Sequence, residues 1–176
     1  MTGRKGMDYH VREFEHRYTL WPVNMLKAIP KSWLSWDYSI VDGSKQVADI
    51  DLAFFREKGK LTVEGEEYTV YRENLASGDF ILDSGNGVLA RAEKPSALFR
   101  RFTIDHQGRQ YTLEAASALS RRFVLLDGST EIGSITPAGL LTRKASVDLP
   151  KDLPLPIRIF IAWLTLIMWR RDSESS

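Results

Sequence analysis

The feature that most constrains the fold is an apolar segment near the end of the chain, Ile157–Trp169 (IRIFIAWLTLIMW). Its thirteen residues exceed the usual length of a strand. Asp152 stands where it can cap a helix start, and Arg170 and Arg171 follow where the helix dipole favours cations. Because this helix is apolar nearly all round, it requires enclosure by protein or by lipid.

Enclosure by lipid is the competing interpretation. The segment spans about 20 Å at 1.5 Å per residue, whereas the hydrocarbon core of a bilayer is about 30 Å thick. Extending the segment back to Leu153 includes Pro154 and Pro156. The length favours a core helix, and a tail-anchored membrane protein remains the alternative.

The preceding sequence repeats one pattern, in which an alternating apolar run meets a glycine-containing turn and a second run. Each repeat is typical of a β-hairpin, because Asp-Gly, Asn-Gly and related pairs supply the positive φ angles of tight turns. The alternation indicates strands with one buried face. The repeats are Tyr38–Ile50, Leu61–Tyr71, Phe80–Ala92, Phe102–Ala115 and Phe123–Ile135.

A first strand near Phe14–Leu20 and a last near Leu140–Val147 bring the expected number to about twelve. Eight strands make a barrel filled by its own side chains, and twelve leave a lumen of the order of a helix diameter, about 10–12 Å. The sequence therefore predicts a mainly β fold, a closed antiparallel barrel enclosing the hydrophobic C-terminal α-helix.

The expected domain organisation is simple. Residues 1–13 form a flexible N-terminal segment and residues 14–171 a single barrel domain, with the core helix at about 153–171. Residues 172–176 form a disordered tail.

Composition limits the function. The 24 basic and 23 acidic residues give no global field that would attract nucleic acid. The absence of cysteine and of an N-terminal apolar region predicts a cytoplasmic protein. No nucleotide-binding or nucleophile motif is present, so no cofactor is expected.

The hairpin turns Asp42-Gly43, Gly85-Asn86-Gly87, Gln107-Gly108 and Asp127-Gly128, followed by the apolar helix, resemble the tubby C-terminal-like superfamily. The resemblance covers about Trp36 to Arg171 and is closest in layout to small LURP-one-related and phospholipid scramblase-like proteins. It implies a closed twelve-stranded barrel around a central helix, and binding to phosphoinositides or other membrane lipids. No residue of the tubby headgroup pocket carries over to this chain.

Three adjacent basic pairs lie near predicted strand ends and are the best candidates for binding an anion or a lipid headgroup. Phosphate recognition uses guanidinium forks or clustered ammonium groups. Neighbouring residues of a strand point to opposite faces, so one member of each pair can face the barrel rim. Solvated surface charge is the alternative. The pairs are Arg100-Arg101, Arg121-Arg122 and Arg143-Lys144.

One line on the helix is less apolar. Arg158, Ala162, Thr165 and Trp169 would form a narrow stripe. We expect this stripe to face a polar part of the lumen, with Arg158 and Thr165 as its candidate polar residues.

Other candidate sites have simple structural interpretations. Asp49 and Asp51 could share one strand face, as a catalytic carboxylate pair would, but a solvent face explains them equally. The three histidines lack metal-ligand spacing, so no metal site is expected. The aromatic entry is expected to plug a barrel mouth, and a short helix or an interaction surface are the alternatives. Its members are Trp21, Trp33, Trp36 and Tyr38.

These observations predict a non-catalytic binding module that contacts phosphoinositide-like phospholipid headgroups or a protein partner through the barrel rim, peripherally at a membrane. Its oligomeric state is open. An enzyme of unknown reaction using a pocket at the barrel mouth is the alternative from a different class.

Overall fold

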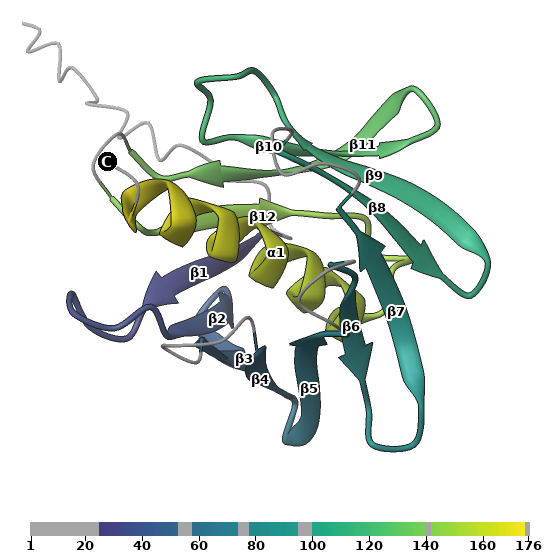
Figure 1. The fold of residues 1–176 in the computed structure, drawn as a ribbon. Coiled ribbons are helices and arrows are strands. Elements are labelled where there is room, and N and C mark those ends of the chain that lie inside the picture. The colour runs from purple at the N-terminus through teal and green to yellow at the C-terminus, as the bar shows by residue number, and fades with distance from the viewer. Residues whose placement is uncertain (1–24, 53–57, 74–77, 95–99, 140–141, 175–176) are drawn as a thin grey trace, which may run out of the picture.

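The computed structural model describes residues 25–52, 58–73, 78–94, 100–139 and 142–174. These residues form a closed antiparallel barrel of twelve strands and one C-terminal helix, which confirms the predicted fold class (Figure 1). The strands are β1 (Leu26–Pro30), β2 (Tyr38–Asp42), β3 (Lys45–Leu52), β4 (Lys58–Val63), β5 (Glu66–Arg72), β6 (Phe80–Asp83), β7 (Val88–Glu93), β8 (Arg101–His106), β9 (Arg109–Ala115), β10 (Phe123–Asp127), β11 (Thr130–Pro137) and β12 (Ala145–Asp148), and the helix is α1 (Leu155–Glu174).

Each strand pairs with its neighbours in sequence, and the barrel closes where β1 pairs with β12. The closing register places Leu26 opposite Val147 and Ala28 opposite Ala145. All four of these side chains are buried, so closure is stabilised by apolar contacts on the inner face as well as by backbone hydrogen bonds.

All five predicted hairpins are present. Two of them turn through pairs with both φ angles positive: Glu64 (51°) with Gly65 (92°), and Gln107 (53°) with Gly108 (78°). Such turns match the right-handed twist of the flanking strands, which explains why a short glycine-containing loop suffices at each of these positions.

The first strand of the barrel differs from the prediction. The expected strand at Phe14–Leu20 and the segment 1–13 lie outside the described residues. The strand that closes the barrel is β1, within the aromatic entry expected to plug a mouth. Pro30 is the last residue of this strand. Proline lacks the backbone N–H that donates to a neighbouring strand, and the end of a strand tolerates this loss.

The helix starts two residues later than predicted and extends to Glu174, into the region expected to be a disordered tail. Residue Ile157 and residues 159–169 are all buried, so α1 is enclosed around its whole circumference by the barrel wall (Figure 1). The apolar segment is therefore a core helix in this fold.

A close approach between helix and wall involves Gly59 of β4. A Cβ atom at this position would lie 2.8 Å from Trp163 Nε1 and 2.6 Å from the Asp51 carbonyl oxygen. Trp163 also makes an edge-to-face contact with Phe80, with ring centroids 5.5 Å apart. Only glycine fits at position 59 without displacing the helix or strand β3.

The two ends of the barrel differ. The five hairpin turns lie at the end where α1 begins, which we call the turn end. The longer connections 31–37 and 116–122, and the described residues 138–139 and 142–144, lie at the end where α1 finishes. We call this second end the C-terminal mouth; it lies on the left of Figure 1.

Candidate functional site

Basic side chains gather at the C-terminal mouth. They come from strand ends, from the connections between strands and from the last turns of α1. The negative end of the helix dipole points to this mouth, and it favours cations there. The basic residues of the mouth are Arg72, Lys94, Arg100, Arg121, Arg143, Arg170 and Arg171.

The first predicted pair divides between the two faces of the barrel wall. Arg100 donates to the Ser120 carbonyl oxygen at 2.7 Å and forms a 2.8 Å ion pair with Asp172 of α1. Its guanidinium lies 5.1 Å from the centroid of the Phe123 ring. Arg101 instead faces outward and pairs with Glu114 on the neighbouring strand, its Nε 2.6 Å from the carboxylate.

The second pair divides in the same way. The Arg121 guanidinium lies 4.7 Å from the centroid of the Trp169 ring, at the end of the core helix. Arg122 pairs with Glu131 on the outer surface.

The third pair places Arg143 at the mouth and leaves Lys144 exposed. Arg143 donates to the carbonyl oxygens of Ser35 at 2.7 Å and Ser32 at 2.6 Å, and lies 5.0 Å from the Trp36 ring centroid. The structure thus brings Arg100, Arg121 and Arg143 to one mouth and keeps their neighbours on the outer wall.

Tyr38 links two of these arginines electrostatically. Its phenol is fully buried, and burial raises the pKa of Tyr38 to about 12, while the positive charges of Arg143 and Arg121 act in the opposite direction. The two guanidinium groups are therefore close enough to the same buried hydroxyl to influence its titration.

Sequence reasoning missed part of the basic cluster. Arg72 and Arg171 both lie over the Phe80 ring, at 5.9 and 5.7 Å from its centroid. Burial lowers the pKa of Lys94, and the charge of Arg72 lowers it further. Their position in the sequence could have indicated Arg72 and Lys94 as members of the cluster. Arg72 ends a strand and Lys94 follows one, and both strands run to the same mouth.

Carboxylates also lie at the mouth among the described residues, and they include Asp37, Glu73, Asp79, Glu93, Asp172 and Glu174. At the turn end, carboxylates outnumber the cations Lys45, Arg109 and Lys151; they are Asp42, Glu64, Glu66, Asp83, Asp105, Asp127, Asp148 and Asp152. The near-neutral net charge of the chain therefore conceals a polarity along the barrel axis that opposes the helix dipole at both ends.

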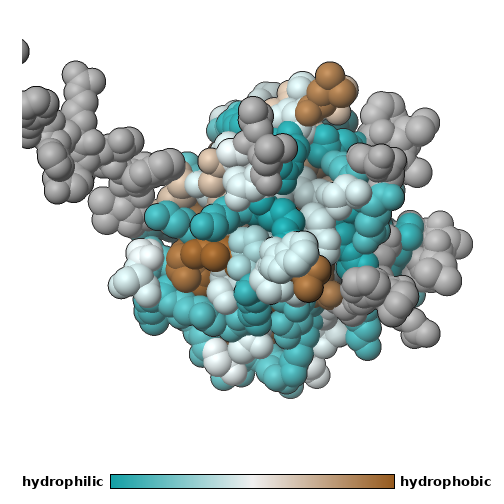
Figure 2. Space-filling view, turned by 90° about the vertical axis from the view of Figure 1, so that its left-hand side faces the viewer, coloured by the Kyte–Doolittle hydropathy of each residue, from teal (hydrophilic) through white to brown (hydrophobic). Residues whose placement is uncertain are grey.

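Exposed apolar side chains project from the connections around the same mouth. Trp33 is 82% exposed, Leu34 is 72% exposed and Leu119 is 96% exposed. Figure 2 views this side of the molecule. It shows separate hydrophobic residues, in brown, on a mainly hydrophilic surface. Trp36, from the same aromatic entry, is instead half-buried against the core, and Trp21 lies outside the described residues.

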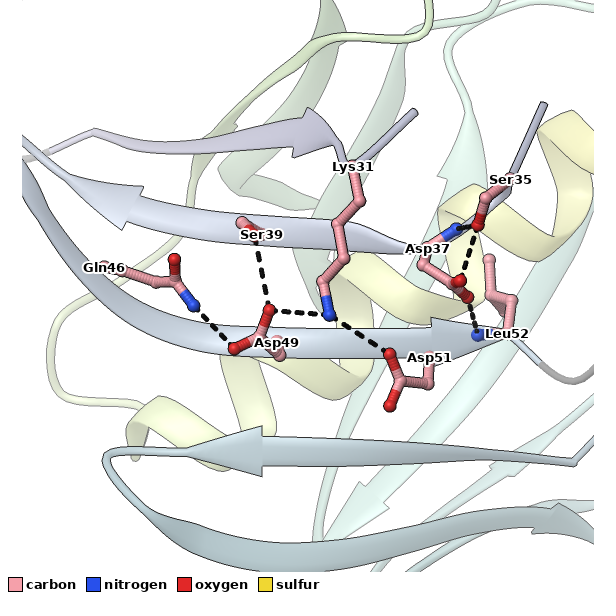
Figure 3. Close-up of polar contacts among 8 residues, drawn as sticks. All are labelled: Lys31, Ser35, Asp37, Ser39, Gln46, Asp49, Asp51 and Leu52. Atoms are coloured by element: carbon pink, nitrogen blue, oxygen red, sulfur yellow. Dashed lines mark hydrogen bonds and ion pairs between the residues drawn. The ribbon is translucent and has the colours of Figure 1, made fainter. Parts of the chain in front are cut away.

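The carboxylate pair lies on the outer face of β3, away from the lumen (Figure 3). Lys31 Nζ bridges the pair, 2.8 Å from Asp49 and 3.2 Å from Asp51. Asp49 also accepts hydrogen bonds from Ser39 at 3.2 Å and Gln46 at 2.5 Å. The hydrogen bond to Asp49 is the main cause that raises the pKa of Lys31. These contacts make a surface network in which one lysine pairs with both carboxylates.

The remaining candidate residues have mainly structural contacts. Thr165 is buried and donates to the Ile161 carbonyl oxygen of its own helix at 3.3 Å, and Arg158 is partly buried at the opposite end of the lumen from the mouth. His106 donates from Nδ1 to the Leu89 carbonyl oxygen at 2.8 Å, while His10 and His16 lie outside the described residues. Within the described ranges, no group of side chains has metal-binding geometry.

Among the described residues, no helix has the length and apolarity needed to cross a membrane. A comparison of the chain with protein-family models, curated proteins and solved structures found no significant match.

Proposed function

We propose that this protein is a non-catalytic binding module that contacts anionic phospholipid headgroups through the C-terminal mouth. The observation that carries the proposal is the convergence of Arg100, Arg121 and Arg143 on one mouth, together with Arg72 at the end of β5, Lys94 after β7 and two arginines of α1. Guanidinium forks match phosphate oxygens, and each cation near an anionic membrane contributes about 1 kcal/mol.

The direction of the helix explains why the mouth tolerates its cations when no ligand is bound. The negative end of the α1 dipole lies beside these cations and stabilises them. It also offsets part of their charge, so the cations themselves must supply the attraction to an anionic surface. A neutral overall charge would keep this attraction local and orient the barrel as it approaches a negatively charged surface.

An enzymatic pocket has less support. A cavity of about 310 Å³ at the mouth is lined by Ser32, Ser35, Asp37 and Arg170 among others. Its polar groups bond one another: Ser35 Oγ donates to Asp37 at 2.5 Å, and Ser32 Oγ accepts from the Ser35 amide at 2.9 Å. These hydrogen bonds therefore stabilise the conformation of the connection 31–37.

Membership of the tubby C-terminal-like superfamily belongs to the same proposal. The closed twelve-stranded barrel around a C-terminal helix is the architecture that the resemblance implies. Lipid binding at a barrel rim would fit both that resemblance and the basic mouth.

The test is sedimentation with vesicles of phosphatidylcholine alone and with added phosphatidylserine or phosphatidylinositol bisphosphate. We expect binding only to the anionic vesicles, weakening between about 50 mM and about 500 mM salt as charges are screened. Arg121→Gln should weaken binding about fivefold, and Arg122→Gln, which removes an equal charge from the outer wall, should change it little. Wild-type protein that ignores anionic vesicles at low salt would overturn the proposal.

A further inference from the structure

The connection 31–37, which we call the tip loop, presents two large apolar side chains to solvent. Trp33 and Leu34 stand at its apex and are 82% and 72% exposed. The loop is closed at its base by a hydrogen bond of 2.8 Å from the Lys31 amide to the Asp37 carbonyl oxygen. Leaving two such side chains in water is unfavourable unless a partner covers them.

Side chains on both sides fix the base of the tip loop (Figure 3). At its start, Lys31 is tied to the outer wall by Asp49 and Asp51. At its end, Asp37 accepts a hydrogen bond of 3.0 Å from the Leu52 amide and one from the Ser35 hydroxyl. The loop is therefore anchored to β3 at two separate points.

Arg143 holds the middle of the tip loop from the neighbouring connection. Its two terminal nitrogens donate to the Ser32 and Ser35 carbonyl oxygens, which lie on either side of the apex, and its guanidinium lies over Trp36. These contacts fix the backbone that carries Trp33 and Leu34. Trp33 and Leu34 are therefore exposed on a loop whose conformation is fixed by hydrogen bonds.

The chemistry around the tip loop favours a lipid bilayer as its partner. The exposed apolar side chains, including Leu119 on another connection, stand apart from one another within hydrophilic surface (Figure 2). The mouth from which they project is the one that carries the basic cluster. Protein interfaces bury one contiguous patch, whereas this arrangement suits a headgroup layer, where cations meet phosphates and projecting apolar side chains reach the acyl boundary. Tryptophan is enriched at that depth of membranes.

We propose that Trp33 and Leu34 insert into the headgroup–acyl boundary of an anionic bilayer, with the C-terminal mouth facing the membrane and the turn end facing away. This inference rests on the proposed function and adds an apolar, salt-resistant contact to its electrostatic one. It also fixes the orientation of the barrel, because the acidic turn end would be repelled by the same surface.

The absence of cysteine from the chain allows an environment-sensitive fluorophore to be attached at single sites. Leu34→Cys reports on the tip loop, and Val88→Cys, 53% exposed at the turn end, is the matched control. With phosphatidylserine vesicles, we expect a blue shift and quenching by nitroxide-labelled lipid at position 34 but not at position 88. In a second arm, Trp33→Ala with Leu34→Ala should lower binding at high salt by more than about tenfold, and Val88→Ala should not.

The outcomes separate the two proposals. If wild-type protein binds no anionic vesicles, both fail. If it binds and the label at position 34 is neither shifted nor quenched, insertion is overturned and the electrostatic contact stands. A blue shift that grows with protein concentration in the absence of vesicles would assign the tip loop to a contact between copies and would also overturn insertion.

Discussion

The Trp169 indole donates a hydrogen bond of 2.9 Å to the main-chain carbonyl oxygen of Arg121, whose guanidinium lies over the same ring. One residue of the core helix thus positions both the backbone and the side chain of a mouth arginine. The packing of α1 and the placement of positive charge at the mouth therefore depend on the same contact.

Replacing Trp169 with Phe keeps an aromatic ring and removes the donor. We expect Trp169→Phe to lower the free energy of unfolding by about 1–3 kcal/mol, because the contact is lost and the smaller ring fills less of the lumen. Urea denaturation followed by circular dichroism measures this change. An unchanged denaturation midpoint would show that the hydrogen bond does not hold the mouth to the helix.

Glycine at position 59 is required by the contact with Trp163. Gly59→Ala should lower the free energy of unfolding by about 1–3 kcal/mol, since the new methyl group would overlap the indole and the β3 backbone. Gly139→Ala is the control, because a Cβ atom there meets nothing closer than 3.5 Å. Equal thermal stability of the two variants would contradict the account of this packing.

The buried phenol of Tyr38 makes stability depend on alkaline pH. Its folded-state pKa is about 12, above the ordinary value of 10.0, so the unfolded chain loses this proton first as the pH rises. The free energy of unfolding should therefore decrease from about pH 10 upward, by about 2–3 kcal/mol over the full window. Tyr38→Phe should lack this part of the decrease, and the difference between the two pH profiles isolates it from other tyrosines and lysines. If stability decreases equally with pH in the wild type and in Tyr38→Phe, the buried phenol does not contribute to the alkaline loss of stability.

Arg143 is expected to act through geometry as well as through charge. Arg143→Lys keeps the positive charge but cannot bridge two carbonyl oxygens with a planar fork. We expect faster amide hydrogen exchange in the tip loop and weaker vesicle binding at high salt, with low-salt binding nearly retained. Lys144→Arg, an exposed neighbour, serves as the control. Unchanged exchange in Arg143→Lys would show that the tip loop holds its shape without the clamp.

The barrel and its helix could be predicted because their signals are local. Five hairpins carry their own turn residues, and Ile157–Trp169 needs an enclosure whatever surrounds it. Strand β1 has only five residues with one lysine and a terminal proline, so its strand structure depends on pairing with β2 and β12. Pairing with distant strands produces no recognisable pattern within five residues of sequence.

The site was predictable only in part. Strand alternation was enough to expect that adjacent basic residues would separate, as Arg121 and Arg122 do. The sequence could not distinguish an exposed Trp33 from a plug of the barrel mouth, because the Arg143 clamp reaches Ser35 from 108 positions away in the sequence. Aromatic residues in a connection more often pack inward, as Trp36 does.

The most direct test of the basic mouth compares two variants with equal loss of charge on phosphatidylserine vesicles at low salt. Arg100→Gln with Arg121→Gln removes two mouth cations, and Arg101→Gln with Arg122→Gln removes their outer-wall neighbours. With both proteins confirmed to be folded by circular dichroism, we expect the first variant to bind about thirtyfold more weakly than wild type and the second to bind within about twofold of it. Equal weakening of both variants would show that binding follows net charge alone and would contradict a site at the C-terminal mouth.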